Sequence, residues 1–181
     1  QQARLDDLLV RLINTVGDRG LAGTQAAYAD EVFEDSLDIT LGGTMLQLVH
    51  AGQAHTPADV FVWLPNEKVV FTGDIVYMER MLSVRPYSHS GSWITAFETL
   101  AALAPEYVVP GHGHVTTLDK ARRDTHAYLQ FLRTAVAEFM DGGGDLADIG
   151  KIDQSAYSDL LNYELLNGRN AQQVYQELEW E

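Results

Sequence analysis

The sequence contains no cysteine among its 181 residues. This absence excludes disulfide bonds and thiolate ligands, so any metal ion must be held by histidine, aspartate or glutamate. Basic residues are scarce, because 12 lysines and arginines stand against 26 aspartates and glutamates, and the formal net charge is -14. A phosphate backbone is bound through clustered basic side chains, so this charge balance argues against a nucleic-acid partner. No run of about 18 apolar residues is present, which argues against a membrane-spanning helix.

The sequence also lacks a starting methionine. It opens on glutamine and goes straight into a pattern of apolar residues at helical spacing, formed by Leu5, Leu8, Leu9, Leu12, Ile13 and Val16. We therefore expect a chain that was processed, trimmed or cut from a longer protein. The compartment stays open between the cytoplasm and the periplasm or exterior after removal of a signal. With 46% apolar residues, the chain is long enough for one domain with a core of its own.

The chain divides into three zones. Residues 1–37 predict a helix and a short helical or irregular piece that lead into a sheet. Residues 38–141 hold the strands and two covering helices, and residues 142–181 predict two further amphipathic helices after a glycine-rich break. Strands that come before helices, followed by one more strand and one more helix, predict an α/β fold with a mixed sheet.

The predicted strands are arranged as two hairpins and one later strand. Gly42 and Gly43 suit the positive φ values that a two-residue hairpin turn needs. The apolar runs on either side of Pro65 and Asn66 predict a second hairpin. Helices are predicted near residues 91–103 and from about 118 to 140, with the strand "EYVVP" between them.

Three polar residues stand out because each follows a predicted strand in a loop with turn character. His55, Asp74 and His112 occupy these positions, where α/β folds place ligand-binding groups. Gly73 lets the chain turn directly before Asp74, and two glycines flank His112. The other histidines, among them His50 and His126, have no such context and suit ordinary surface or core positions.

At these residues the sequence resembles the C-terminal half of a metallo-β-lactamase-fold hydrolase. The similarity is carried by "HTPADVFVWLPNEKVVFTGD" at 55–74 and "VVPGHG" at 108–113, and it covers roughly residues 38–141. It implies half of an αββα sandwich with a helical extension at 142–181. It also implies two zinc ions, or manganese or iron, with His55 completing the first site, Asp74 bridging both metals and His112 binding the second.

One part of the family pattern is absent. The His-x-His-x-Asp-His motif, which supplies four further ligands in the family, occurs nowhere in this sequence. Three of the usual seven ligands cannot close two metal sites. We therefore expect this chain alone to bind metal weakly or not at all, and to be inactive without the missing half.

Two classes of function follow. In the first, the chain is part of a hydrolase that uses a metal-bound hydroxide on an ester, lactone, thioester or lactam. The N-terminal half of the same protein, or a second chain, then completes the site, with a symmetric dimer as another means of covering the sheet. In the second, the chain is a non-catalytic half-domain that acts as a binding or structural module.

The loop after Asp74 is expected to overhang the site, as it does in the family. Tyr87, His89 and Trp93 are the predicted substrate-facing residues there, although loop aromatics often only cover a sheet edge. Asp59 is expected to orient a neighbouring group by a hydrogen bond beside the metal ligands. The sequence does not distinguish among the substrate classes.

Overall fold

The structure is a computed structural model of the chain, and it describes residues 10, 12–17, 19–25, 27 and 29–181. The chain divides into two compact units, Gln1–Val32 and Phe33–Glu181. In the first unit, residues 12–17 are helical, whereas Leu5, Leu8 and Leu9 of the predicted helix lie outside the described residues. The described residues of 24–35 hold no helix, which agrees with the irregular alternative that the sequence left open for this stretch.

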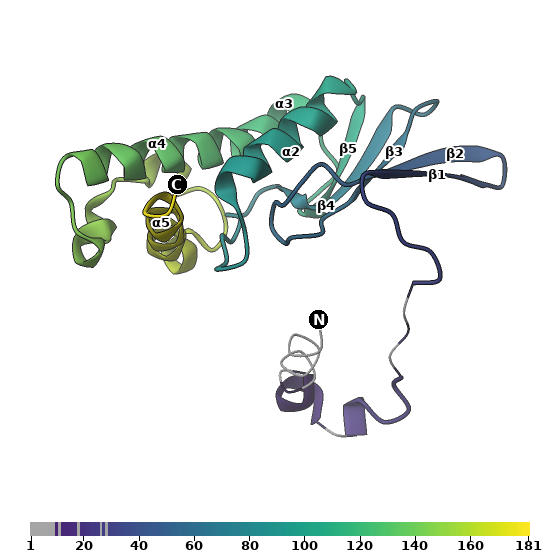
Figure 1. The fold of residues 1–181 in the computed structure, drawn as a ribbon, viewed down its shortest axis with the longest axis horizontal. Coiled ribbons are helices and arrows are strands. Elements are labelled where there is room, and N and C mark those ends of the chain that lie inside the picture. The colour runs from purple at the N-terminus through teal and green to yellow at the C-terminus, as the bar shows by residue number, and fades with distance from the viewer. Residues whose placement is uncertain (1–9, 11, 18, 26, 28) are drawn as a thin grey trace. The chain divides into compact units, whose positions relative to one another are not determined.

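The second unit is built on a five-stranded mixed sheet (Figure 1). The strands are β1 (Ser36–Leu41), β2 (Thr44–Val49), β3 (Phe61–Leu64), β4 (Val69–Tyr77) and β5 (Tyr107–His112), in the order β1-β2-β3-β4-β5. The first three pairings are antiparallel and the pairing of β4 with β5 is parallel. Gly42 and Gly43 connect β1 to β2 with φ values of 57° and 87°, as the hairpin turn requires. The predicted α/β fold class is confirmed.

In the second unit, one helix lies between β4 and β5 in the sequence, and the other helices follow β5. They are α2 (Ser90–Ala102), α3 (Leu118–Ala121), the π-helical turn η1 (Arg122–Ala127), α4 (Tyr128–Asp141) and α5 (Tyr163–Leu178). The 3₁₀ turns η2 (Leu146–Lys151) and η3 (Ser155–Tyr157) precede α5. The long helix predicted over 118–140 is therefore present but contains a π-helical turn. The prediction of two helices after residue 142 is wrong, because the first part of that tail forms only short 3₁₀ turns.

The core lies between one face of the sheet and these helices. Phe61, Trp63 and Val70 are buried on this face, where they join Trp93 and Phe97 of α2 in a single apolar cluster. Figure 1 shows α2 and the run from α3 to α4 on the same side of the sheet. Both the end of β4 and the end of β5 reach the margin of this layer, and the predicted site residues lie there.

The opposite face of the sheet is apolar but partly exposed. Leu48, Val62, Phe71 and Val109 are paired neighbours across four strands, so their side chains share this face. Phe71 is 44% exposed, and Ile39 on the same face is 40% exposed. Within the described part of the chain, no helix is long and apolar enough to cross a membrane.

Candidate metal centre

His55, Asp74 and His112 come together at the edge of the sheet. The Nε2 atom of His55 lies 3.7 Å from Asp74 Oδ2, and the Nε2 atom of His112 lies 3.5 Å from Asp74 Oδ1. Each imidazole thus faces a different oxygen of the same carboxylate. The side chains of Asp74 and His112 are about one-third exposed, at 34% and 37%, so solvent reaches the site.

These distances fit ligand atoms around a shared metal better than they fit hydrogen bonds. A charged hydrogen bond between imidazole and carboxylate brings nitrogen and oxygen to about 2.7–2.9 Å. Two ligand atoms about 2.1 Å from a tetrahedral zinc ion are instead about 3.4 Å apart. The observed 3.5 and 3.7 Å match this second spacing. Two neutral imidazoles and a carboxylate are also donors that suit zinc.

Two glycines allow the strands to approach each other at this point. Gly73 adopts a φ of +50°, in the left-handed region that favours glycine, immediately before Asp74. A Cβ atom on Gly111 would lie 2.5 Å from Asp74 Oδ1 and 2.5 Å from the carbonyl carbon of Gly73. Gly111 is therefore needed for the contact between β5 and the Asp74 carboxylate, beyond leaving His112 uncovered as the sequence suggested.

Tyr77 is a site residue that the sequence reasoning missed. Its hydroxyl donates a hydrogen bond to Asp74 Oδ2 at 3.1 Å, and its ring lies 4.7 Å from that of His112. Burial raises the pKa of the Tyr77 phenol well above its usual value, and the Asp74 carboxylate adds to this effect, so the phenol keeps its proton and remains a donor. The only signal in the sequence is a tyrosine three positions after Asp74 in the same strand.

The Nδ1 atoms of His55 and His112 differ in their hydrogen-bond partners. Among the described residues, the Nδ1 atom of His55 and the Nε atom of Arg80 are buried without a hydrogen-bond partner. The Nδ1 atom of His112 lies 3.4 Å from a terminal nitrogen of Arg80. His55 is placed by its surroundings instead, because Ser88 donates a hydrogen bond to its backbone carbonyl at 2.7 Å.

The predicted substrate-facing residues lie in three different settings. Tyr87 is 40% exposed, and its ring centroid is 6.3 Å from that of His55. Trp93 is fully buried, packs 5.6 Å from the His55 ring and donates a hydrogen bond to the Ile75 carbonyl. Because its side chain is enclosed, Trp93 supports His55 from within the core and does not face a substrate. His89 belongs to a separate cluster.

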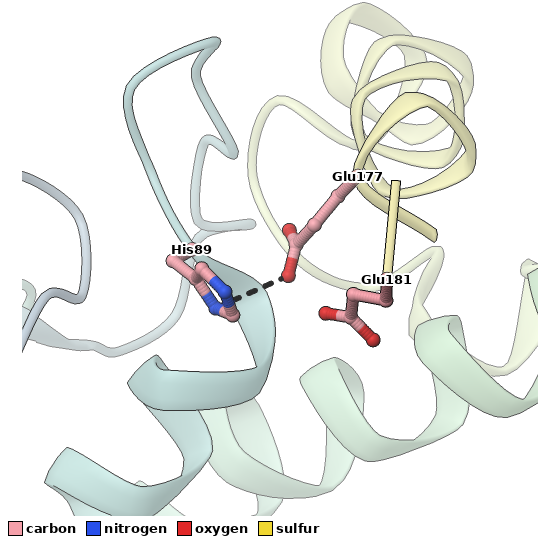
Figure 2. Close-up of side chains that lie close together, drawn as sticks. All are labelled: His89, Glu177 and Glu181. Carbon is pink, nitrogen blue, oxygen red and sulfur yellow. Dashed lines mark ion pairs between the residues drawn. The ribbon is translucent and has the colours of Figure 1, made fainter. Parts of the chain in front are cut away.

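That cluster joins the start of α2 to the C-terminal helix (Figure 2). The Nδ1 atom of His89 lies 3.3 Å from Glu177, and it accepts a hydrogen bond from the Ser92 N–H as the N-cap of α2. Ligand atoms of His89, Glu177 and Glu181 lie close enough together to hold a metal ion. Arg133, however, pairs with Glu177 at 2.8 Å and with Glu181 at 2.6 Å, so both carboxylates already share a guanidinium as their partner. The His89 imidazole therefore serves this contact between helices.

Asp59 braces the loop that carries His55. Its carboxylate accepts hydrogen bonds from the backbone N–H of Thr56 at 2.6 Å and from the Thr56 hydroxyl at 2.9 Å. The backbone carbonyl of Asp59 lies 2.8 Å from His50 Nδ1. Asp59 thus fixes Thr56, the residue that follows His55.

Known proteins share this sequence and fold. The sequence model of the metallo-beta-lactamase superfamily matches residues 7–112, which is more than half of the chain. A metallo-beta-lactamase type 2 of Bacteroides fragilis is 34% identical over 85 residues, covering 45% of this chain and 34% of that protein. A linear primary-alkylsulfatase of Pseudomonas sp. (strain ATCC 19151) is 23% identical over 116 residues, covering 61% of this chain and 21% of that protein.

A solved structure of a metallo-beta-lactamase from Pontibacter korlensis aligns with a TM-score of 0.53 and 26% identity, and the alignment covers 61% of this chain and 53% of that one. The chain spans about a third or less of the two curated relatives described above. The extent of the family match, together with the mixed sheet that carries the three ligand-like residues, shows that this chain belongs to the metallo-beta-lactamase superfamily.

Proposed function

We propose that this chain forms part of a metal-dependent hydrolase, with His55, Asp74 and His112 as metal ligands. The observation that carries the proposal is the placement of one imidazole Nε2 atom against each oxygen of Asp74. With an imidazole nitrogen beside each of its oxygens, Asp74 would hold metal ions together with His55 and His112. Members of this superfamily generally bind metal ions such as zinc.

Each residue has a separate part in this arrangement. His55 would hold one metal ion, His112 the other, and Asp74 both. Tyr77 donates its hydrogen bond to Asp74 Oδ2 and so fixes the rotation of the carboxylate. When bound, the metal ions supply a water molecule activated for attack on a carbonyl or related centre. Zinc suits the donor set best, and manganese or iron is the alternative.

We further propose that other ligands come from outside these 181 residues. Three ligands leave most coordination positions of two metal ions open. The exposed apolar face that carries Phe71 and Ile39 is where a second sheet would pack. The N-terminal half of the same protein, or a second chain that supplies an equivalent half, would cover this face and complete the centre.

The substrate class is an ester-like or amide-like bond that activated water can cleave. The relatives described above are named as a beta-lactamase and an alkylsulfatase, so a lactam and a sulfate ester are the first compounds to test. Lactones and thioesters complete the panel. A half-domain without catalytic activity is the alternative outcome.

The test is hydrolysis of this panel by the chain combined with its N-terminal half, with and without added Zn²⁺. We expect Zn²⁺-dependent turnover of at least one class. Asp74→Asn should lower kcat/KM by more than about 100-fold, beyond the loss usual for a residue that only supports a ligand. His114→Ala is the matched control, because His114 is highly exposed and pairs with Glu79. Equal activity of the Asp74→Asn variant would refute the proposal.

A further inference from the structure

The backbone that follows Asp74 is held by side chains from the π-helical turn η1. The Thr125 hydroxyl accepts a hydrogen bond from the Tyr77 N–H at 3.0 Å and donates one to the Tyr77 carbonyl at 2.7 Å. Asp124 Oδ2 accepts a hydrogen bond from the Glu79 N–H at 3.0 Å. Between these two, the Met78 N–H donates to the carbonyl of His112 at 2.9 Å. Three successive backbone N–H groups are thus bound by η1 and by the His112 strand.

These hydrogen bonds replace regular strand pairing where the sheet becomes irregular. The register of β4 against β5 shifts between Gly73 and Tyr77. Thr125 is fully buried and Asp124 is 5% exposed, so water does not compete for these hydrogen bonds. Loss of the Thr125 hydroxyl would leave the N–H and C=O groups of Tyr77 buried without partners, and the strand end would have to move to satisfy them.

The π-helical turn itself brings these two side chains to the strand. A π-helical turn inside an α-helical run is rare and occurs frequently at functional sites. Here it lies between α3 and α4, and of its adjacent residues Thr125 reaches Tyr77 at the end of β4 while Asp124 reaches Glu79, two residues beyond that end. Asp124 is fixed in turn by Arg123, which donates to it at 2.8 Å and pairs with both carboxylate oxygens of Asp159.

The held segment leads directly into the candidate centre. Thr125 binds both the backbone N–H and the backbone carbonyl of Tyr77, and the phenol of Tyr77 donates a hydrogen bond to Asp74. Met78, held through its N–H, is bonded to the backbone of His112. A movement at Thr125 would therefore reach Asp74 through one side chain and His112 through one backbone hydrogen bond.

We propose that Thr125 and Asp124 are positioning residues of the metal centre, and that Thr125 acts through Tyr77 to fix the Asp74 carboxylate. The inference rests on the proposed function in one respect, namely that Asp74 is a metal ligand. It assigns a part in holding the metal centre to η1, which lies outside the segments that carry His55, Asp74 and His112.

The test compares Thr125→Val, which removes the hydroxyl and keeps the shape, with Thr125→Ser, which keeps the hydroxyl. Two quantities are measured on the full chain: Zn²⁺ affinity by calorimetry, and the ¹³Cζ resonance of Tyr77, assigned with Tyr77→Phe. We expect Thr125→Val to weaken Zn²⁺ binding by about 10-fold or more, as for other residues that orient metal ligands. It should also shift the Tyr77 resonance, whereas Thr125→Ser should remain close to the wild type.

Two further variants separate positioning from general stability. Thr99→Val is the matched control, because the Thr99 hydroxyl is exposed and donates a hydrogen bond to the Thr95 carbonyl of its own helix. Tyr77→Phe leaves the hydrogen bonds between Thr125 and the Tyr77 backbone intact. It should reproduce the loss of Zn²⁺ affinity even if Thr125→Val does not fold. In the Tyr77→Phe background, Thr125→Val should add little further loss.

Unchanged Zn²⁺ affinity in both Thr125→Val and Tyr77→Phe would overturn the inference, as would an unshifted Tyr77 resonance in a folded Thr125→Val chain. A wild-type chain that binds no Zn²⁺ even when it is combined with its N-terminal half would count against the proposed function. In that case the Tyr77 resonance alone would decide whether Thr125 fixes the Tyr77 side chain on Asp74.

Discussion

Asp74 is the residue on which the geometry of the site depends. Its Oδ1 atom faces His112, and its Oδ2 atom faces both His55 and the Tyr77 hydroxyl. Asp74 itself follows a glycine with positive φ, and a second glycine, Gly111, lies against its carboxylate. The position of one carboxylate is thus set by three side chains and by two glycines.

Gly111→Ala tests this close approach. The added methyl group would lie 2.5 Å from Asp74 Oδ1 and from backbone of Gly73, so β4 and β5 must separate. We expect a loss of about 1–3 kcal/mol in the free energy of unfolding, as for other overpacked sites, with weaker Zn²⁺ binding. Urea denaturation and calorimetry measure the two effects.

The matched control is Gly168→Ala in the interior of α5, where a Cβ atom meets nothing within 4 Å. Alanine there should stabilise the protein by about 0.5–1 kcal/mol, because glycine is the poorer helix residue. If Gly111→Ala proved as harmless as Gly168→Ala, the account of the contact between β5 and Asp74 would be wrong.

At the scale of elements, α5 is joined to the segment after β4 by a buried polar network. Asn170 is fully buried, accepts a hydrogen bond from the Val84 N–H, and donates to the Leu82 carbonyl and to the Tyr128 hydroxyl. Burial raises the pKa of Tyr128 well above its usual value, so its phenol keeps its proton throughout the ordinary pH range. The C-terminal extension is thereby part of the same packed unit as the sheet.

Asn170→Ala should cost about 2–4 kcal/mol of the free energy of unfolding, because it leaves buried backbone groups of Leu82 and Val84 without partners. Thermal or urea denaturation gives this value. Asn167→Ala is the control on the same helix, since the Asn167 amide donates only to the Tyr163 carbonyl and is half-buried. Its expected cost is below about 1.5 kcal/mol. Equal losses for the two variants would show that the network contributes no special stability.

The sequence predicts elements whose signals are local. The glycine pair at 42–43, the apolar stripe of α2 and the strand "EYVVP" lead directly to elements that the structure contains. The grouping of His55, Asp74 and His112 was predictable for the same reason, because each belongs to a short motif near the end of a predicted strand, although the structure places Asp74 within β4 and His112 at the end of β5 and not in the loops that follow them. The contacts of Thr125 with Tyr77 and of Asn170 with Leu82 were not, since they join residues 48 and 88 positions apart through irregular backbone.

At the scale of the whole molecule, we expect the partly exposed apolar face of the sheet to be covered by a partner. Each 100 Å² of apolar surface left in water forgoes about 2.5 kcal/mol of stabilisation. We therefore expect the isolated chain to associate through this face, with a mass above the 20.1 kDa of a monomer in light scattering after size exclusion. Addition of the proposed N-terminal half should replace this association.

Phe71→Asp should restore a monomer by placing a charge on this face, whereas Val115→Asp should not. Val115 is 60% exposed and lies in the loop after β5, so it serves as a control for the added charge. A well-folded wild-type monomer at high concentration, without a companion chain, would contradict the need for a cover and would favour a non-catalytic module.

The central claim is that His55 and His112 bind metal on either side of Asp74. It is tested most directly by titrating the chain, labelled with ¹⁵N at its histidines, with Zn²⁺ and following the ring nitrogens by NMR, which detects even weak binding. We predict that the Nε2 resonances of His55 and His112 shift together, that Asp74→Ala abolishes both shifts, and that the other four histidines respond little. A response centred on His89, beside Glu177 and Glu181, with His55 and His112 unmoved, would contradict the claim.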